Sequence, residues 1–341
     1  MISGLMPWLL FIPSAVCAVA PMVAFLAILW WLDRFDRGPL WLVFLTFAWG
    51  AVGGVLFGVA GSLSLEVPLW IFSVRPEHAD AIGAAVIAPL AEEPAKALFL
   101  LLVMWNRNFD GMTHGFVYGA AAGLGFGMTE NFLYFQSVAG ASDLPSWLEV
   151  VVIRTFFSAV MHASATSMVG AALGFARFRG KIAIVVLGSF GLLLAMSMHA
   201  LWNGLITLDV LNQQQGLETS IQAANYFLFP MEVFVLFVIF QVALLDEGRT
   251  IRRELEEEAR AGLIPADHPK QLSSWFGRHF TSGWLSPKVP SRRYIQASTS
   301  LAIRKVQARA TVSEFHRDEV ARLRRRIRLL LERAGDAPQP Q

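Results

Sequence analysis

The sequence predicts an all-α, polytopic membrane helix bundle with about seven transmembrane helices and a basic helical tail. Only 16% of the 341 residues are charged and 55% are hydrophobic, whereas soluble domains carry about 25% charged residues. Residues 1–245 hold 9 Lys and Arg against 14 Asp and Glu, and residues 246–341 hold 19 against 12. Composition and charge therefore predict a transmembrane domain at 1–245 and a cytoplasmic tail at 246–341.

Seven apolar segments are candidate spans, because each is long enough for a tilted helix across about 30 Å of hydrocarbon. They lie at about 8–32, 38–61, 82–104, 114–136, 150–176, 182–207 and 225–245. Lys and Arg gather in the alternate loops at 33–37, 105–113 and 177–181, and such loops face the cytoplasm. We therefore expect a multi-pass protein of the inner (plasma) membrane, with its N-terminus outside and its C-terminus inside. No basic residue precedes the first segment, so we expect a retained span rather than a cleaved signal.

The tail is expected to extend the last helix and to form two more helices, near 291–310 and 313–333. The second is basic and amphipathic. Its arginines are Arg322, Arg324, Arg325, Arg326 and Arg328, interleaved with Leu323, Ile327, Leu330 and Leu331. Such a helix suits the surface of a bilayer that contains anionic lipid. The alternative is a solvated helix without a ligand, and nucleic-acid binding is not expected.

The third segment carries charges that a membrane span ordinarily lacks. Glu92, Glu93 and Lys96 lie inside the apolar run 82–104, where each charge costs about 2.5–3.5 kcal/mol on insertion scales. Lys96 stands three and four residues after the glutamates, so it can meet either of them on one helix face. Pro94 between them bends the helix. A buried Glu–Lys packing pair is one interpretation, but the second glutamate favours a polar site.

Three later segments carry polar residues at helical spacing. They are Gly115, Gly119, Gly123 and Gly127 with Asn131 and the adjacent Glu130, then Arg154, Ser158, His162 and Thr166, and finally His199 and Asn203. Small residues four apart predict a close helix contact, which indicates that Glu130 faces protein rather than lipid. Counting about 1.5 Å per residue from the predicted outer ends, we expect Glu93, Glu130, His162 and His199 at similar depths, in the outer half of the membrane or near its midplane. The four segments therefore predict one polar constellation.

These motifs, in this order, resemble those of the PrsW-type intramembrane proteases, which are related to the CAAX prenyl proteases and bacteriocin-processing membrane proteins. The matching stretches are Glu92-Glu93-Pro94-Ala95-Lys96, Phe126-Gly127-Met128-Thr129-Glu130-Asn131, His162 with Thr166, and His199-Ala200-Leu201-Trp202-Asn203. The resemblance covers residues 80–205 and not the tail. It implies an intramembrane endopeptidase of glutamic or metallo type. Its substrate would be a single-pass membrane protein, such as an anti-sigma factor, cut on the extracytoplasmic side.

The analogy with the CAAX enzymes implies roles for the site residues. Glu92 would be the general base with Glu93 supporting it, and His199 and Asn203 would stabilise the oxyanion. Glu130 and His162 would complete the catalytic group, with Lys96 and Asn131 in supporting positions. The chain departs from the CAAX pattern in two places, because Lys96 replaces an arginine one position later and Glu130 replaces a histidine. The acid and base roles of the CAAX enzymes therefore cannot be assigned directly to the residues of this chain.

A zinc site is the second mechanism that these residues allow. Glu92, Glu130, His162 and His199 could supply three ligands, with water in the fourth position, although no His-Glu-x-x-His run is present. Two other functions explain the same residues. An ion-coupled transporter would use the Glu, His and Lys residues as a relay, which the absence of an internal repeat disfavours. A catalytically inactive membrane scaffold would keep the same motifs but would not cleave a substrate.

Overall fold

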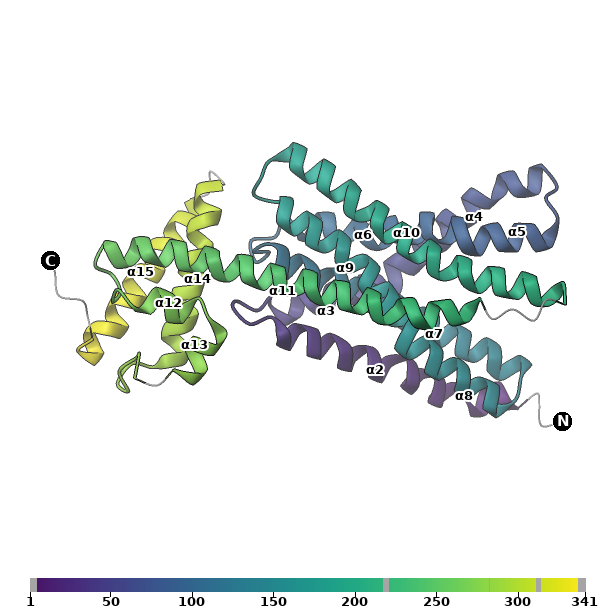
Figure 1. Ribbon diagram of the computed structural model, residues 1–341, viewed down its shortest axis with the longest axis horizontal. Coiled ribbons are helices and arrows are strands. Elements are labelled where there is room, and N and C mark those ends of the chain that lie inside the picture. Colours follow the sequence, from purple (N-terminus) through teal and green to yellow (C-terminus); the bar gives the residue numbers. More distant parts are fainter. Residues whose placement is uncertain (1–4, 217–220, 282, 311–313, 337–341) are drawn as a thin grey trace. The chain divides into compact units, whose positions relative to one another are not determined.

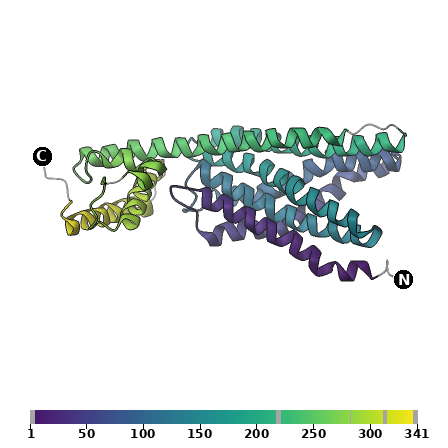
Figure 2. The same ribbon diagram turned by 60° about the horizontal axis from the view of Figure 1, so that its bottom comes forward.

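The computed structural model describes residues 5–216, 221–281, 283–310 and 314–336. These residues form helices and loops without a strand, which confirms the predicted all-α class (Figure 1). The chain divides into two compact units. The membrane unit comprises Met1–Leu32 and Gly38–Val238, and the tail unit comprises Asp33–Arg37 and Ile239–Gln341. The domain boundary at residue 245 stays a prediction, because the helix α11 continues through this point without a break (Figure 2).

The membrane unit is built from long helices, three of which contain a π-helical segment (η). In order these are α1 (Met6–Leu9), α2 (Phe11–Leu32), α3 (Leu40–Ala48), η1 (Trp49–Gly54), α4 (Val55–Ile71), α5 (Pro76–Ile82), η2 (Gly83–Ile87), α6 (Ala88–Val103), α7 (Met112–Ala141), α8 (Leu144–Ile153), η3 (Arg154–Ser158), α9 (Ala159–Ala176), α10 (Lys181–Gln214) and α11 (Gln222–Arg260).

Among the described residues, 5 helices or helix runs are long and apolar enough to cross a membrane. They are Phe11–Leu32, Leu40–Ile71, Leu144–Ala176, Lys181–Gln214 and Ala223–Arg260. The chain is therefore a multi-pass membrane protein. The predicted spans at 82–104 and 114–136 are helical but are not among the five. The first contains three charged residues, and the second is glycine-rich and enclosed by other helices. The count of seven spans and the orientation of the termini stay predictions.

The pairing of α7 with α9 is the most extensive helix contact in the membrane unit. A Cβ atom on Gly115, Gly119 or Gly123 of α7 would overlap a backbone carbonyl of α9. The four-residue glycine row thus lets the two backbones touch, as the sequence predicted. Because the helices are so close, polar residues that follow the row on α7 face the polar stripe of α9 directly.

The tail unit combines the end of α11 with α12 (His268–Leu272), α13 (Trp275–Phe280), α14 (Ser291–Ala310) and α15 (Glu314–Ala334). Both helices predicted in the tail are confirmed, apart from residue 313, which lies outside the described residues. The apolar face of α15, including Leu323, Ile327 and Leu331, is buried in the core of this unit. That face is therefore not available to enter a bilayer. Binding of anionic lipid by α15 stays a prediction and would depend on its arginines alone.

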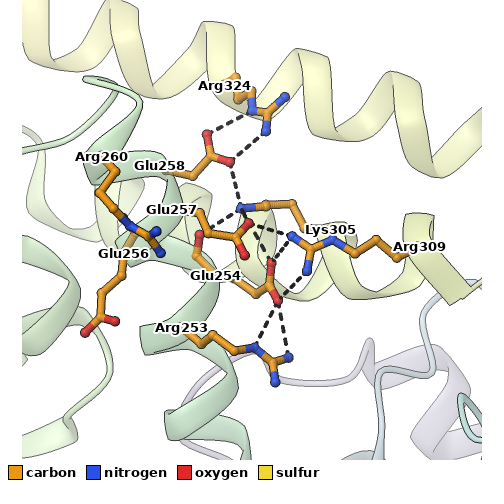
Figure 3. Close-up of polar contacts among 9 residues, drawn as sticks. All are labelled: Arg253, Glu254, Glu256, Glu257, Glu258, Arg260, Lys305, Arg309 and Arg324. Atoms are coloured by element: carbon orange, nitrogen blue, oxygen red, sulfur yellow. Dashed lines mark hydrogen bonds and ion pairs between the residues drawn. The ribbon is translucent and has the colours of Figure 1, made fainter.

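A network of ion pairs joins α11, α14 and α15 inside the tail unit (Figure 3). Lys305 Nζ lies 2.8 Å from Glu258 Oε1 and 3.0 Å from Glu257 Oε2. Arg309 Nη2 lies 2.8 Å from Glu254 Oε2, and Arg324 Nη2 lies 2.7 Å from Glu258 Oε1. The carboxylates all come from α11 and these cations from the two later helices, so the network fixes how the three helices pack.

Candidate active site

Glu93, on α6, is fully buried at the centre of the polar constellation. Its Oε1 atom accepts from Lys96 Nζ at 2.7 Å and lies 2.9 Å from His199 Nδ1. Its Oε2 atom accepts from Thr166 Oγ1 at 3.3 Å. An ionised carboxylate can only accept hydrogen bonds, so Nδ1 of His199 carries the proton. The Nε2 atom of His199 is therefore unprotonated and acts as an acceptor.

Glu92 differs from Glu93 in exposure and in partners. Its side chain is 17% exposed, and Oε2 lies 3.5 Å from Lys96 Nζ and 4.0 Å from His199 Nε2. Among the described residues, Oε1 of Glu92 makes no hydrogen bond or ion pair. The neighbouring glutamates thus point to different partners, as their separation by one helix position requires. Glu92 therefore keeps an oxygen that can act on another molecule.

Glu130 and His162 form a second carboxylate–histidine pair, which joins α7 to α9. Nε2 of His162 lies 2.6 Å from Glu130 Oε2, and Nδ1 lies 3.0 Å from Lys96 Nζ. The lysine ammonium is a donor without an acceptor, so Nδ1 accepts and Nε2–H donates to Glu130. Arg154 Nη2 lies 2.9 Å from the same Glu130 oxygen. Glu130 therefore orients His162 and is itself held by Arg154.

Two asparagines complete the constellation. Asn131 donates to the backbone carbonyl of Arg154 at 3.3 Å and accepts from its Nε at 3.1 Å. Asn203 donates to the carbonyl of Ala84 at 2.9 Å, and its Nδ2 atom lies 3.2 Å from His199 Nε2. Asn131 therefore fixes the arginine that holds Glu130, whereas Asn203 covers the open nitrogen of His199.

Each π-helical segment contributes to this region. η2 supplies the Ala84 carbonyl that accepts from Asn203, and η3 begins with Arg154. In η1, a Cβ atom on Gly54 would lie 3.7 Å from Lys96 Cγ, so this segment packs directly against the lysine. Such π-helical turns are frequent at functional sites.

The structure brings together every residue predicted for the site. They are Glu92, Glu93, Lys96, Glu130, Asn131, His162, His199 and Asn203. The predicted gathering of these side chains is seen in their contacts, whereas their depth in the membrane and the catalytic role of each residue stay predictions. Sequence reasoning missed Arg154 as the partner of Glu130 and Thr166 as a partner of Glu93, although both lie on the predicted polar stripe. Nothing in the sequence indicated the carbonyl of Ala84.

Three of the four predicted metal ligands lie close enough to share an ion. Glu92, His162 and His199 each offer one ligand atom, and these atoms lie within 4.8 Å of one another. One carboxylate and two imidazoles fit a catalytic zinc site with three protein ligands. The Glu93–His199 hydrogen bond adds the carboxylate that orients a metal-binding histidine. Glu130 is not in this group, because Oε2 faces His162 and Arg154 instead.

Comparison with known proteins agrees with this geometry. The family model described as "PrsW family intramembrane metalloprotease" matches residues 38–243. Protease PrsW of Bacillus subtilis (strain 168) is 25% identical over 195 residues, which cover 55% of this chain and 80% of that protein. No solved structure matches the chain. The family match includes every residue of the candidate site and more than half of the sequence, and the chain therefore belongs to the PrsW family of intramembrane proteases.

Proposed function

We propose that this protease cuts a single-pass membrane protein, such as an anti-sigma factor, in the outer half of the bilayer, and that Glu92 activates the water. One observation carries the proposal. Among the residues that the structure describes, Glu92 keeps an open oxygen and has no partner closer than 3.5 Å, whereas Glu130 is held by His162 at 2.6 Å and by Arg154 at 2.9 Å. Glu92 also lies within 4.8 Å of two histidines that other carboxylates hold in place. A peptide hydrolase needs such a base, together with donors for the oxyanion.

Asn203 supplies an amide donor that would meet the substrate carbonyl, and His199 holds this amide in place. Glu93 keeps the proton of His199 on Nδ1, so Nε2 accepts from the amide of Asn203. When another partner occupies Nε2, that amide N–H is free to donate to a developing oxyanion. A group that binds Nε2 of His199 therefore also releases the Asn203 amide for the substrate.

We propose further that Glu92, His162 and His199 hold a zinc ion, in agreement with the description of the family. The three ligand atoms within 4.8 Å of one another support this proposal. A zinc ion supplies Lewis-acid polarisation of a carbonyl group and of water. Glu93 and Glu130 would hold the two imidazoles, and Lys96 would give up its contact with Nδ1 of His162 so that this nitrogen could face the ion. In the metal-free alternative, Glu92 alone takes the proton from water.

The test of proteolysis is cleavage of a co-expressed single-pass reporter. Glu92→Gln removes the base and keeps the shape of the side chain, so cleavage should be lost while the protein remains in the membrane. Glu149→Gln is the matched control, because Glu149 is exposed on α8. This variant should cleave the reporter as the wild type does. Wild-type cleavage by Glu92→Gln would refute the proposed base.

The metal is tested separately by elemental analysis of the purified full-length protein. Stoichiometric zinc is expected in the wild type and in Glu149→Gln, and its loss in Glu92→Gln and His199→Ala. A wild-type protein without stoichiometric zinc that keeps full activity in chelator would favour the metal-free mechanism. Comparative membrane proteomics of cells with the wild type and Glu92→Gln should then show one accumulating single-pass protein, which is the substrate.

A further inference from the structure

Three aromatic side chains gather on the short helix α13 of the tail unit. Phe276 is 66% exposed and Phe280 is 70% exposed, and their ring centroids lie 5.8 Å apart. Trp275 packs against both, with ring centroids at 5.2 and 5.7 Å. Single exposed apolar residues are ordinary on protein surfaces. Here two neighbouring phenylalanine side chains are each about two thirds exposed and pack against a tryptophan. Such an apolar patch indicates a binding surface for another molecule.

α13 lies against two segments that lead directly out of apolar spans. On α11, a Cβ atom on Gly248 would lie 2.9 Å from the carbonyl oxygen of Ser273, in the turn before α13. Gly248 stands three residues after the apolar run 225–245, which is about 4.5 Å along a helix. This contact places the start of α13 near the point where α11 leaves its apolar stretch.

The second segment is Asp33–Arg37, which follows the last residue of α2. The guanidinium of Arg34 lies 5.2 Å from the ring centroid of Trp275. The guanidinium of Arg278, on α13, lies 4.6 Å from the ring centroid of Phe35. α2 ends at Leu32, so α13 contacts the chain segment that directly follows a second apolar helix. Segments that continue from two apolar helices therefore contact the same short helix or the turn before it.

We propose that α13 is an interfacial membrane anchor, with Phe276 and Phe280 inserted at the boundary between lipid headgroups and acyl chains. Aromatic side chains concentrate at this boundary, where an apolar ring can be buried while polar neighbours stay hydrated. Arg34 over Trp275 fits the same position, because a guanidinium can stack on the ring and still reach a phosphate. The anchor holds the tail unit against the membrane that its own helix crosses.

The charge of the tail unit selects anionic phospholipid as the partner of this anchor. Glu254, Glu257 and Glu258 are engaged by cations within the unit (Figure 3). Exposed cations remain near α13, including Arg249 one residue beyond Gly248 and Lys270 at the end of α12. Basic residues beside a membrane exit are attracted to anionic headgroups. Lipid insertion and electrostatic attraction therefore act at the same place.

The depth of the anchor can be measured in full-length protein in phosphatidylglycerol-containing vesicles. With Cys17 replaced by alanine, nitroxide labels are placed at Phe276→Cys, Phe280→Cys and the exposed control Ala261→Cys. Ala261 follows the end of α11, about 24 Å of helix beyond residue 245. Labels at 276 and 280 should collide with oxygen more than with a water-soluble nickel chelate, and the label at 261 should show the reverse. Omitting the anionic lipid should raise nickel access at 276.

Two results would overturn the anchor. One is nickel access at 276 and 280 equal to that at 261, which would indicate a solvated helix. The other is strong dipolar broadening between labels at 276, which would indicate that a second copy covers the aromatics.

A separate measurement uses hydrogen exchange of α13 in vesicles. Phe276→Ala with Phe280→Ala should accelerate exchange several-fold, whereas Phe315→Ala on α15, a phenylalanine that is 39% exposed, should not. Unchanged exchange in the double variant would also reject the proposal.

Discussion

Nδ1 of His199 lies 2.9 Å from Oε1 of Glu93, and this hydrogen bond separates the roles of the two neighbouring glutamates. Glu93 has both oxygens engaged, by Lys96, Thr166 and His199. Glu92 keeps one oxygen open beside the same histidine. We therefore expect Glu93 to be a positioning residue within the site, and its loss should affect stability as well as chemistry.

Glu93→Gln should destabilise the membrane unit by about 3–5 kcal/mol, because it leaves Lys96 buried without its closest counter-charge. The ammonium of Lys96 is fully buried and lies 2.7 Å from Glu93 but 3.5 Å from Glu92. Glu92→Gln should change stability far less. Thermal unfolding in detergent compares the two variants. Adding Lys96→Met to Glu93→Gln should restore most of the stability and none of the cleavage. Equal unfolding temperatures for Glu93→Gln and the wild type would contradict this role.

Gly123→Ala should separate α7 from α9 and reduce both stability and cleavage. A Cβ atom at Gly123 would overlap the backbone carbonyl of His162, so the helices must move apart at the level of the Glu130–His162 pair. Overpacking of this kind costs about 1–3 kcal/mol. Gly140→Ala, on the same helix, is the control, because a Cβ there would meet only Pro7 Cγ at 3.6 Å. The contact is unimportant if both variants unfold and cleave alike.

Helical periodicity was enough to predict most of the site. The glycine row on α7 and the polar stripe on α9 repeat every four residues, and this spacing places each set on one helix face whatever the tertiary structure. Depth, counted along the helices, then brought Glu93, Glu130, His162 and His199 to one level. The contacts of His162 and His199 with those glutamates show that the four residues lie together, and their depth in the membrane stays a prediction.

Other features depend on tertiary packing and could not be predicted in this way. The wide turn at Arg154–Ser158 has no sequence pattern of its own, yet it sets the direction of Arg154 toward Glu130. The amphipathic pattern of α15 indicated an apolar partner but could not distinguish a bilayer from the core that α15 shares with α14. Hydropathy likewise cannot decide whether α7 crosses the membrane, because a helix enclosed by protein needs small residues rather than lipid-like ones.

Arg154→Lys tests whether Glu130 needs the shape of the guanidinium as well as its charge. Arg154 reaches Glu130 through Nη2 and Asn131 through Nε, and a lysine cannot make both contacts in this fork geometry. His162 would then be less well oriented, and cleavage should fall by about 10- to 100-fold, the usual effect of losing a group that orients a metal-binding histidine. Kinetics with a purified reporter measure the loss. Full activity in Arg154→Lys would show that charge alone suffices.

The tail unit should lose stability as the pH falls below about 6.5, because of His268. This side chain is 2% exposed, and Nδ1 lies 2.6 Å from the hydroxyl of Tyr294. Burial lowers the pKa of His268 from its ordinary value of 6.5, and the carboxylates of Asp267 and Asp336 offset only part of that effect. The unfolded chain therefore takes up a proton at a pH where the folded unit does not, so the stability present above the unfolded pKa is lost on acidification.

Hydrogen exchange of α12 and α14, corrected for intrinsic rates, should quicken between about pH 7.5 and about pH 5.5, on either side of the ordinary pKa. His268→Gln should weaken this pH dependence, and His78→Gln, at an exposed position on α5, should leave it unchanged. The same pH dependence in the wild type and in His268→Gln would assign the loss of stability to other groups.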